Sequence, residues 1–137
     1  MVSADHSSSC GIHQGNIFDG GAAAGFVIRF PHLGDYSIYH AGDTGIFLDM
    51  QLINKLYKPT HLLLPIGGNF TMGPEEAAHA CRFFTHARVV IPMHFLTHAL
   101  VAGTFEDFVS FLNLKNVVHV KPLNSYADLL GKTIELE

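Results

Sequence analysis

Two short apolar runs constrain the fold of this chain more than any other feature. Residues 61–65 read His-Leu-Leu-Leu-Pro, and residues 88–92 read Arg-Val-Val-Ile-Pro. Such runs, without polar alternation, are typical of strands that are covered on both faces of a sheet. Apolar residues recur at helical spacing over 46–57, and a further helix start lies at Pro74, where proline can occupy the first turn. Strands that alternate with helices predict a layered α/β architecture.

The remaining segments add an antiparallel element to this pattern. Residues 25–30 and 36–40 are β-prone runs joined by a turn, which indicates a hairpin and therefore a mixed sheet with flanking helices. Residues 7–21 are rich in Ser and Gly and are expected to form a loop. We also expect a helix over 104–114, capped by Thr104, and weaker strands over 117–120 and 133–136.

Charge and cysteine content argue against several classes of protein. The chain has 137 residues with 8 Lys and Arg, 12 Asp and Glu and a net charge of −4, without a basic stripe. We therefore expect no nucleic-acid or membrane partner. The two cysteines form no Cys-x-x-Cys pair, there is no long apolar run, and the first residues are polar, so a cytoplasmic location is expected.

Residues able to bind metal follow the ends of predicted strands. His40 and Asp43 come after the hairpin, Gly67, Gly68 and Asn69 after the first apolar run, and His94 after the second. Loops at strand ends are common places for functional sites in α/β folds. Each residue also has a structural interpretation, because Asp beside Gly often forms a turn or cap and a histidine at a strand end is often packed. His6, near a polar terminus, is most simply solvated.

Three strings resemble one family of proteins. They are Tyr-His-Ala-Gly-Asp-Thr at 39–44, Pro-Ile-Gly-Gly-Asn-Phe-Thr-Met-Gly-Pro-Glu-Glu-Ala at 65–77, and Pro-Met-His-Phe at 92–95. Their order and spacing are similar to those of metallo-β-lactamase-fold metal-dependent hydrolases, near the branch of the ascorbate-phosphate lactonases. Ala-Asp-His-Ser-Ser-Ser at 4–9 resembles that branch's histidine motif before the central hairpin. At Gly68, relatives often carry Asp. The resemblance covers nearly the whole chain.

The resemblance implies a metal site and a reaction class. It makes His6 a ligand of a first metal, Asp43 a catalytic carboxylate that bridges two metals, and His94 a ligand of the second. Imidazole and carboxylate suit zinc, with manganese or iron as alternatives. The implied function is hydrolysis of an ester, lactone, amide or phosphoester of a small-molecule substrate by metal-bound hydroxide. His40, Gly68, Asn69 and His98 are expected around the ligands, although packing explains His40 about as well.

One motif of the family is missing. His-x-His-x-Asp-His would lie upstream of His6 and occurs nowhere in this sequence. The resemblance therefore implies that residues 1–137 form a single partial domain, the C-terminal αβ half of an αββα sandwich. We expect it to pair with a complementary N-terminal half or with a copy of itself, because an isolated half would expose an apolar sheet face. The alternatives are a non-catalytic remnant that acts through protein contacts and a metal-free module that binds small molecules.

Overall fold

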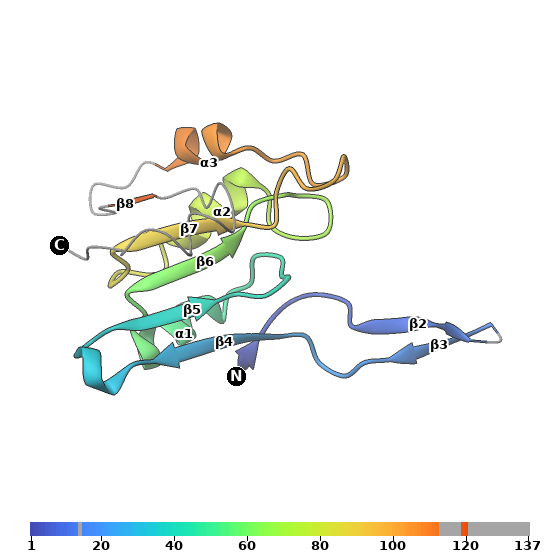
Figure 1. The fold of residues 1–137 in the computed structure, drawn as a ribbon, viewed down its shortest axis with the longest axis horizontal. Helices are drawn as coiled ribbons and strands as arrows, with labels where there is room; N and C mark the ends of the chain where they lie inside the picture. The colour runs from blue at the N-terminus through green and yellow to red at the C-terminus, as the bar shows by residue number, and fades with distance from the viewer. Residues whose placement is uncertain (14, 113–118, 121–137) are drawn as a thin grey trace.

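The chain folds around one mixed sheet. The computed structural model describes residues 1–13, 15–112 and 119–120. Six strands lie in the order β1-β4-β5-β6-β7-β8 (Figure 1). Their bounds are β1 (Val2–Ser3), β4 (Ala24–Arg29), β5 (Ser37–His40), β6 (His61–Pro65), β7 (Val89–Met93) and β8 (His119–Val120). The strands β1, β4 and β5 pair antiparallel, whereas β5 to β8 pair parallel, which confirms the predicted hairpin and mixed sheet.

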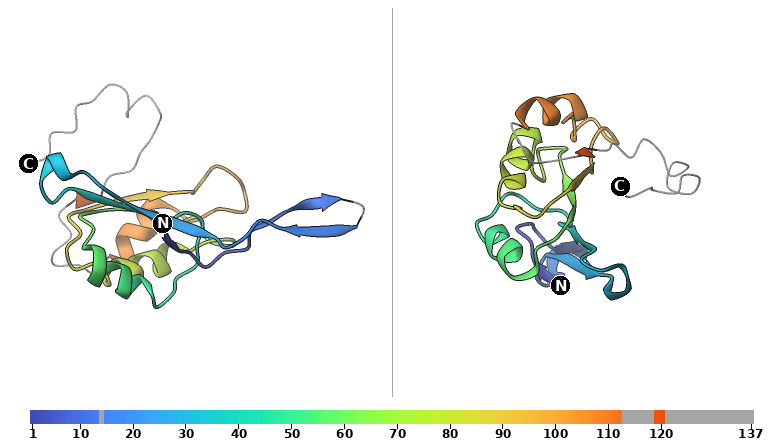
Figure 2. Two further views of the ribbon diagram at one scale, coloured as in Figure 1. Left: turned by 90° about the horizontal axis from the view of Figure 1, so that it is seen from below. Right: turned by 90° about the vertical axis from the view of Figure 1, so that its left-hand side faces the viewer.

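The helices lie on one side of this sheet. They are α1 (Met50–Tyr57), α2 (Pro74–Cys81) and α3 (Phe105–Phe111), and Figure 2 shows α1 and α2 along the same face, with α3 beside α2. The core between the layers contains Tyr39 of β5, Leu62 and Leu64 of β6 and Val90 of β7, all fully buried. The Tyr39 ring stacks on Phe84, with ring centroids 5.2 Å apart. The layered α/β architecture expected from the two apolar runs is therefore confirmed.

The starts of α2 and α3 follow from local sequence. Pro74 occupies the first turn of α2, and the Glu76 carboxylate accepts a hydrogen bond of 2.9 Å from the Gly73 N–H. Thr104 caps α3, because its Oγ1 accepts a 3.0 Å hydrogen bond from the Asp107 N–H. Both caps satisfy backbone donors that no helical carbonyl can reach.

The first helix is shorter than its apolar pattern predicted. It begins at Met50, whereas the pattern indicated residues 46–57. The Met50 and Gln51 N–H groups bond to carbonyls three residues earlier, as in a tight turn. The segment before α1 is held at Thr44, whose carbonyl oxygen accepts a 2.9 Å hydrogen bond from the Met72 N–H. Residues 45–49 are therefore not helical, and Ile46 and Phe47 pack partly against the core.

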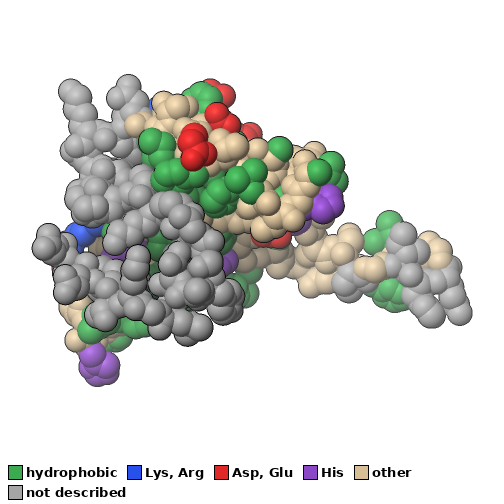
Figure 3. Space-filling view, turned by 45° about the horizontal axis from the view of Figure 1, so that its top comes forward, with side chains coloured by type: hydrophobic (Ala, Val, Ile, Leu, Met, Phe, Trp, Pro, Cys, Tyr) green, Lys and Arg blue, Asp and Glu red, His purple; other side chains and the backbone are tan. Residues whose placement is uncertain are grey.

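The expected loop over 7–21 is instead a hairpin. β2 (Ser9–His13) and β3 (Asn16–Asp19) pair antiparallel and project away from the body of the molecule (Figure 1). All of β3 is exposed, including Ile17 at 69% and Phe18 at 50%, and hydrophobic side chains are visible on this ribbon in Figure 3. The prediction was wrong because a polar composition argues against burial, whereas pairing of two strands with each other needs little burial.

Some expectations concern residues without a described placement. The strand expected over 133–136 lies outside the described residues. The helix expected over 104–114 ends earlier, at Phe111, because Leu112 has left the helical conformation with ψ of +83°. Of the strand expected over 117–120, only β8 is described. Among the described helices, none has the length and apolarity that a membrane span requires.

Candidate metal centre

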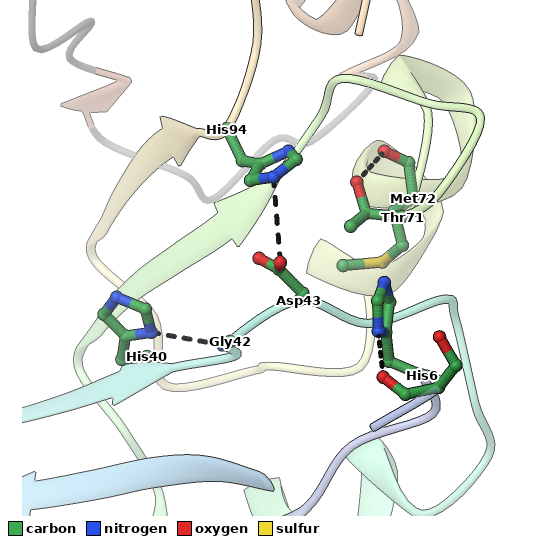
Figure 4. A network of polar contacts seen from close by, with 8 residues as sticks. His6, His40, Gly42, Asp43, Thr71, Met72 and His94 are labelled. Atoms are coloured by element: carbon green, nitrogen blue, oxygen red, sulfur yellow. Dashed lines mark hydrogen bonds and ion pairs between the residues drawn. The ribbon is translucent and has the colours of Figure 1, made fainter. Parts of the chain in front are cut away.

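Asp43 and His94 meet at one edge of the sheet. Asp43 lies three residues after β5 ends, and His94 directly follows β7. Because β5, β6 and β7 are parallel, the loops after them emerge at the same edge. The carboxylate Oδ2 of Asp43 lies 3.7 Å from Nε2 of His94, and Figure 4 shows the two side chains pointing toward each other. Their exposed side-chain fractions, 52% and 36%, leave both groups accessible to a ligand.

The backbone that carries His94 adopts an uncommon conformation. His94 has φ of +54°, in the left-handed region that residues with a Cβ rarely occupy. Gly67, at the end of the neighbouring strand, lies so close that an added Cβ would be 2.2 Å from the His94 carbonyl oxygen. Strain of this kind often accompanies functional positions. The glycine at 67 thus permits the close approach of the His94 loop.

Asp43 is presented by a similarly constrained turn. Gly42 has φ of +71°, and a Cβ there would lie 2.7 Å from the Ala24 carbonyl oxygen. The Gly42 N–H donates to Nδ1 of His40 at 3.1 Å. Glycine and this hydrogen bond together shape the turn from which the Asp43 side chain projects.

His6 lies beside the same loop. The Asp5 N–H donates to Thr44 Oγ1 at 2.9 Å, and the Gly45 N–H donates to the Asp5 carbonyl at 2.8 Å. Nδ1 of His6 lies 2.7 Å from the Ser7 carbonyl oxygen, which can only accept, so Nδ1 is the donor of this bond and Nε2 is the ring nitrogen left for a metal. Figure 4 shows His6 near the pair formed by Asp43 and His94. Within the described ranges, however, no three His, Cys, Asp or Glu side chains are close enough to share one ion.

The residues expected around the ligands occupy different places. Nδ1 of His40 accepts a hydrogen bond from the Gly42 N–H, and Figure 4 shows the ring turned toward Gly42. His98 is exposed and accepts from the Leu100 N–H at 3.2 Å. Gly68, with φ of +75°, donates to the Met72 carbonyl at 3.0 Å, while Asn69 is exposed with φ of +62°. Their contribution to a metal site stays a prediction.

Thr44 was not singled out from the sequence, although it organises the site. It is fully buried, its hydroxyl accepts from Asp5 and donates to the Gly45 carbonyl, and its own carbonyl accepts from Met72. It therefore joins the His6 segment, the Asp43 loop and the turn after β6. The available signal was its position directly after Asp43 in the first of the resembling strings.

The donors present fit part of a zinc site. Two ligand atoms on one tetrahedral zinc ion lie roughly 3.4 Å apart, given bond lengths of about 2.0–2.2 Å. The 3.7 Å between Asp43 and His94 is close to this value and too long for a hydrogen bond. Carboxylate and imidazole are also ordinary zinc donors. Two donors are half of a four-coordinate site, so the described residues fit a shared or incomplete centre.

Comparison with known proteins places this geometry in a family. Residues 2–94 match the model of the beta-lactamase superfamily domain. A UPF0173 metal-dependent hydrolase of Methanosarcina mazei is 51% identical over 108 residues, which is 79% of this chain and 45% of that protein. One of Archaeoglobus fulgidus is 42% identical over 130 residues, which is 92% of this chain and 54% of that protein. The chain thus spans about half the length of these relatives.

Solved structures agree with the sequence matches. Igni18, described as a novel metallo hydrolase from Ignicoccus hospitalis, has a TM-score of 0.61 and 31% identity over 88% of this chain and 46% of its own. An isothiocyanate hydrolase from Delia radicum gut bacteria has a TM-score of 0.59 over 74% of this chain and 42% of its own, with 20% identity, and supports the fold alone. The mixed sheet, the site at its edge and these matches show that the chain belongs to the metallo-β-lactamase-fold superfamily.

Proposed function

We propose that this chain supplies part of the metal site of a metal-dependent hydrolase. The observation that carries the proposal is the convergence of Asp43 and His94, from loops after two parallel strands, to 3.7 Å. The relatives described as metal-dependent hydrolases support the reaction class. We expect a divalent metal, with zinc preferred over manganese or iron because of the imidazole donors.

Each residue has a defined part in this proposal. Asp43 and His94 would hold the ion directly, and His6, beside the Asp43 loop, is the proposed third donor, although its side chain would have to move to join them. A bound divalent metal lowers the pKa of a coordinated water and thereby supplies a nucleophile at neutral pH. The constrained turns at Gly42 and Gly67 hold the two donors in place, so that little reorganisation is needed when an ion enters. The substrate class that follows is a small ester, lactone, amide or phosphoester.

The remaining ligands must come from outside these residues. We propose that a complementary αβ half provides them and covers the sheet face opposite the helices. On that face Phe26 and Ile28 of β4 are 50% and 45% exposed, and their register partners His40 and Ile38 on β5 are only partly buried. Among the described helices none covers this face (Figure 2). A partner here would bury the apolar surface and approach the edge that carries Asp43.

The second candidate is a non-catalytic remnant that acts through protein contacts. It is favoured by the presence of only two converging donors among the described residues. Metal binding separates the two candidates, because a remnant has no reason to retain a selective site at this edge.

A metal-binding experiment tests the proposal directly. The purified chain is equilibrated with zinc, passed over a desalting column and analysed for bound metal by mass spectrometry. Asp43→Ala and His94→Ala are each expected to lower zinc affinity by at least about tenfold, because each removes one of two primary donors.

Two matched variants control for loss of charge and of imidazole. Asp49→Ala removes an exposed carboxylate whose side chain makes no capping bond to α1, and His32→Ala removes an exposed histidine in the turn after β4. Both are expected to bind zinc as the unaltered chain does. If all four variants bind equally, the assignment of Asp43 and His94 is wrong.

A further inference from the structure

A large cavity lies at the edge of the sheet opposite the candidate metal centre. Its volume is about 870 Å³, within the range of pockets that bind small molecules. Its lining comes from the end of β4, the start of β5, the end of α1 and the segments before β6 and β7. These are the amino ends of the parallel strands, whereas Asp43 and His94 follow the carboxyl ends. The turn of residues 31–33 and the loops after β5 to β7 lie at opposite ends of the sheet in Figure 1.

The lining of the cavity is positively charged, although the net charge of the protein is −4. The described residues include five Lys and Arg against nine Asp and Glu, yet three of the five cations, Arg29, Lys58 and Arg88, line this one space. Its lining contains a single carboxylate, Asp35. Within the described part of the chain none of the three cations forms an ion pair with a carboxylate, since the one pair there joins His94 to Asp43. Among the described residues no carboxylate neutralises these charges, although Nη2 of Arg29 donates to the Leu56 and Tyr57 carbonyl oxygens at 3.5 Å.

The wall of the cavity is built from fixed polar and aromatic groups. Ser37 and Thr60 are 4% and 6% exposed, and they are held together by two hydrogen bonds of 3.1 and 3.0 Å between the Thr60 hydroxyl and the Ser37 backbone. The Arg29 guanidinium carbon lies 5.5 Å from the centroid of the Tyr57 ring, and the Tyr36 ring lies 4.2 Å from the His61 ring, centroid to centroid, with the planes tilted by 33°. Burial, and to a smaller extent the nearby Arg88 charge, lowers the pKa of His61, which follows Thr60 in the chain.

We propose that this cavity binds a small organic phosphate whose anionic group is attached to a planar ring. Guanidinium groups match phosphate oxygens with paired hydrogen bonds, and Arg29 and Arg88 bring two of them to one space. Tyr36 and Tyr57 add aromatic rings to the lining, which the ring of a ligand can contact. The volume is far larger than inorganic phosphate needs, which favours a ligand with an organic part. The site is independent of the proposed metal centre.

Phenyl phosphate is a suitable probe, used with EDTA so that no metal-dependent reaction intervenes. Binding is followed by amide chemical shifts of the chain, and the largest shifts are expected at Ser37, Thr60 and Arg88. Arg29→Gln and Arg88→Gln are each expected to weaken binding about tenfold, because each removes a charge-assisted hydrogen bond. Lys58→Gln is a third variant for the case that one arginine variant does not fold. The amide spectrum reports folding in each case.

Lys55→Gln and Arg82→Gln are the matched controls, because both remove an exposed positive charge that lies outside the cavity. They are expected to change affinity less than about twofold, as for weakly coupled surface charges. An equal loss in all variants would show unspecific attraction, and the proposal would be wrong. Inorganic phosphate alone should bind more weakly than phenyl phosphate. Benzoate binding as tightly as phenyl phosphate would overturn the assignment of a phosphate, and shifts confined to another surface would overturn the site.

Discussion

Gly67 is the residue on which the placement of His94 depends most. Its φ is not in the left-handed region, so the restriction is one of space, set by the His94 carbonyl 2.2 Å from an ideal Cβ. Gly67→Ala is therefore expected to destabilise the chain by about 1–3 kcal/mol, as in overpacked interiors. It should also weaken zinc binding through displacement of His94. Chemical denaturation and the metal assay measure the two effects.

Gly45→Ala provides the comparison. A Cβ at Gly45 would meet Asp5 side-chain and backbone atoms at 3.7 and 3.8 Å, which are ordinary contacts. This variant is expected to unfold at nearly the same denaturant concentration as the unaltered chain. Equal stability of the Gly67 and Gly45 variants would contradict the proposed crowding at Gly67.

The sequence indicated individual site residues better than their arrangement. Asp43 and His94 could be named because they follow strand ends and lie in strings that resemble a family, and the structure brings them together. His6 lies beside Asp43, but its Nδ1 bonds to its own neighbour Ser7, a local contact that no spacing rule predicts. Thr44 was overlooked because its role depends on two backbone partners that are distant in sequence, Asp5 and Met72. That these residues bind metal stays a prediction.

Among the helices, the stability of α3 depends on its N-terminal cap at Thr104. It has only seven residues, and Phe108 is its one fully buried side chain. Short helices gain little from propensity, so the hydrogen bond from Asp107 to Thr104 matters. Thr104→Ala is expected to lower the free energy of unfolding by about 1 kcal/mol. Thr97→Ala, at an exposed threonine in the preceding loop, should leave it unchanged. Thermal unfolding of both variants tests this expectation.

The strands β4 to β7 and the starts of α2 and α3 were predicted well, because their signals are local. Continuous apolar runs gave β6 and β7, and proline with acidic residues gave the start of α2. The start of α1 was placed four residues early, because the bond between Thr44 and Met72 that holds the preceding turn is not visible in an apolar pattern. The ribbon of β2 and β3 was missed, since pairing between exposed strands leaves no hydrophobic periodicity.

For the molecule as a whole, the open sheet face makes association the main prediction. We expect the chain to self-associate when produced alone, and to form an equimolar complex when produced together with the part of the Methanosarcina mazei relative that it does not match. Ile28→Asp should weaken both associations, because it places a charge within the apolar face. Ile17→Asp, on the projecting ribbon, is the matched control and should leave both associations unchanged. Sedimentation velocity distinguishes the species. A monodisperse monomer that does not bind the added part of the Methanosarcina mazei relative would contradict the proposed pairing.

The projecting ribbon has a consequence for how this protein can vary in length. Its base is closed by the Ser8 hydroxyl on the Gly21 carbonyl and by a 2.8 Å bond from the Gly20 N–H to the Ser8 carbonyl. Beyond this closure the strands contact each other rather than the core, so insertions or deletions at the tip would leave the geometry around His6 undisturbed. The ribbon is thus a part of the described chain where added sequence, natural or from a fused reporter, is expected to cost little folding free energy.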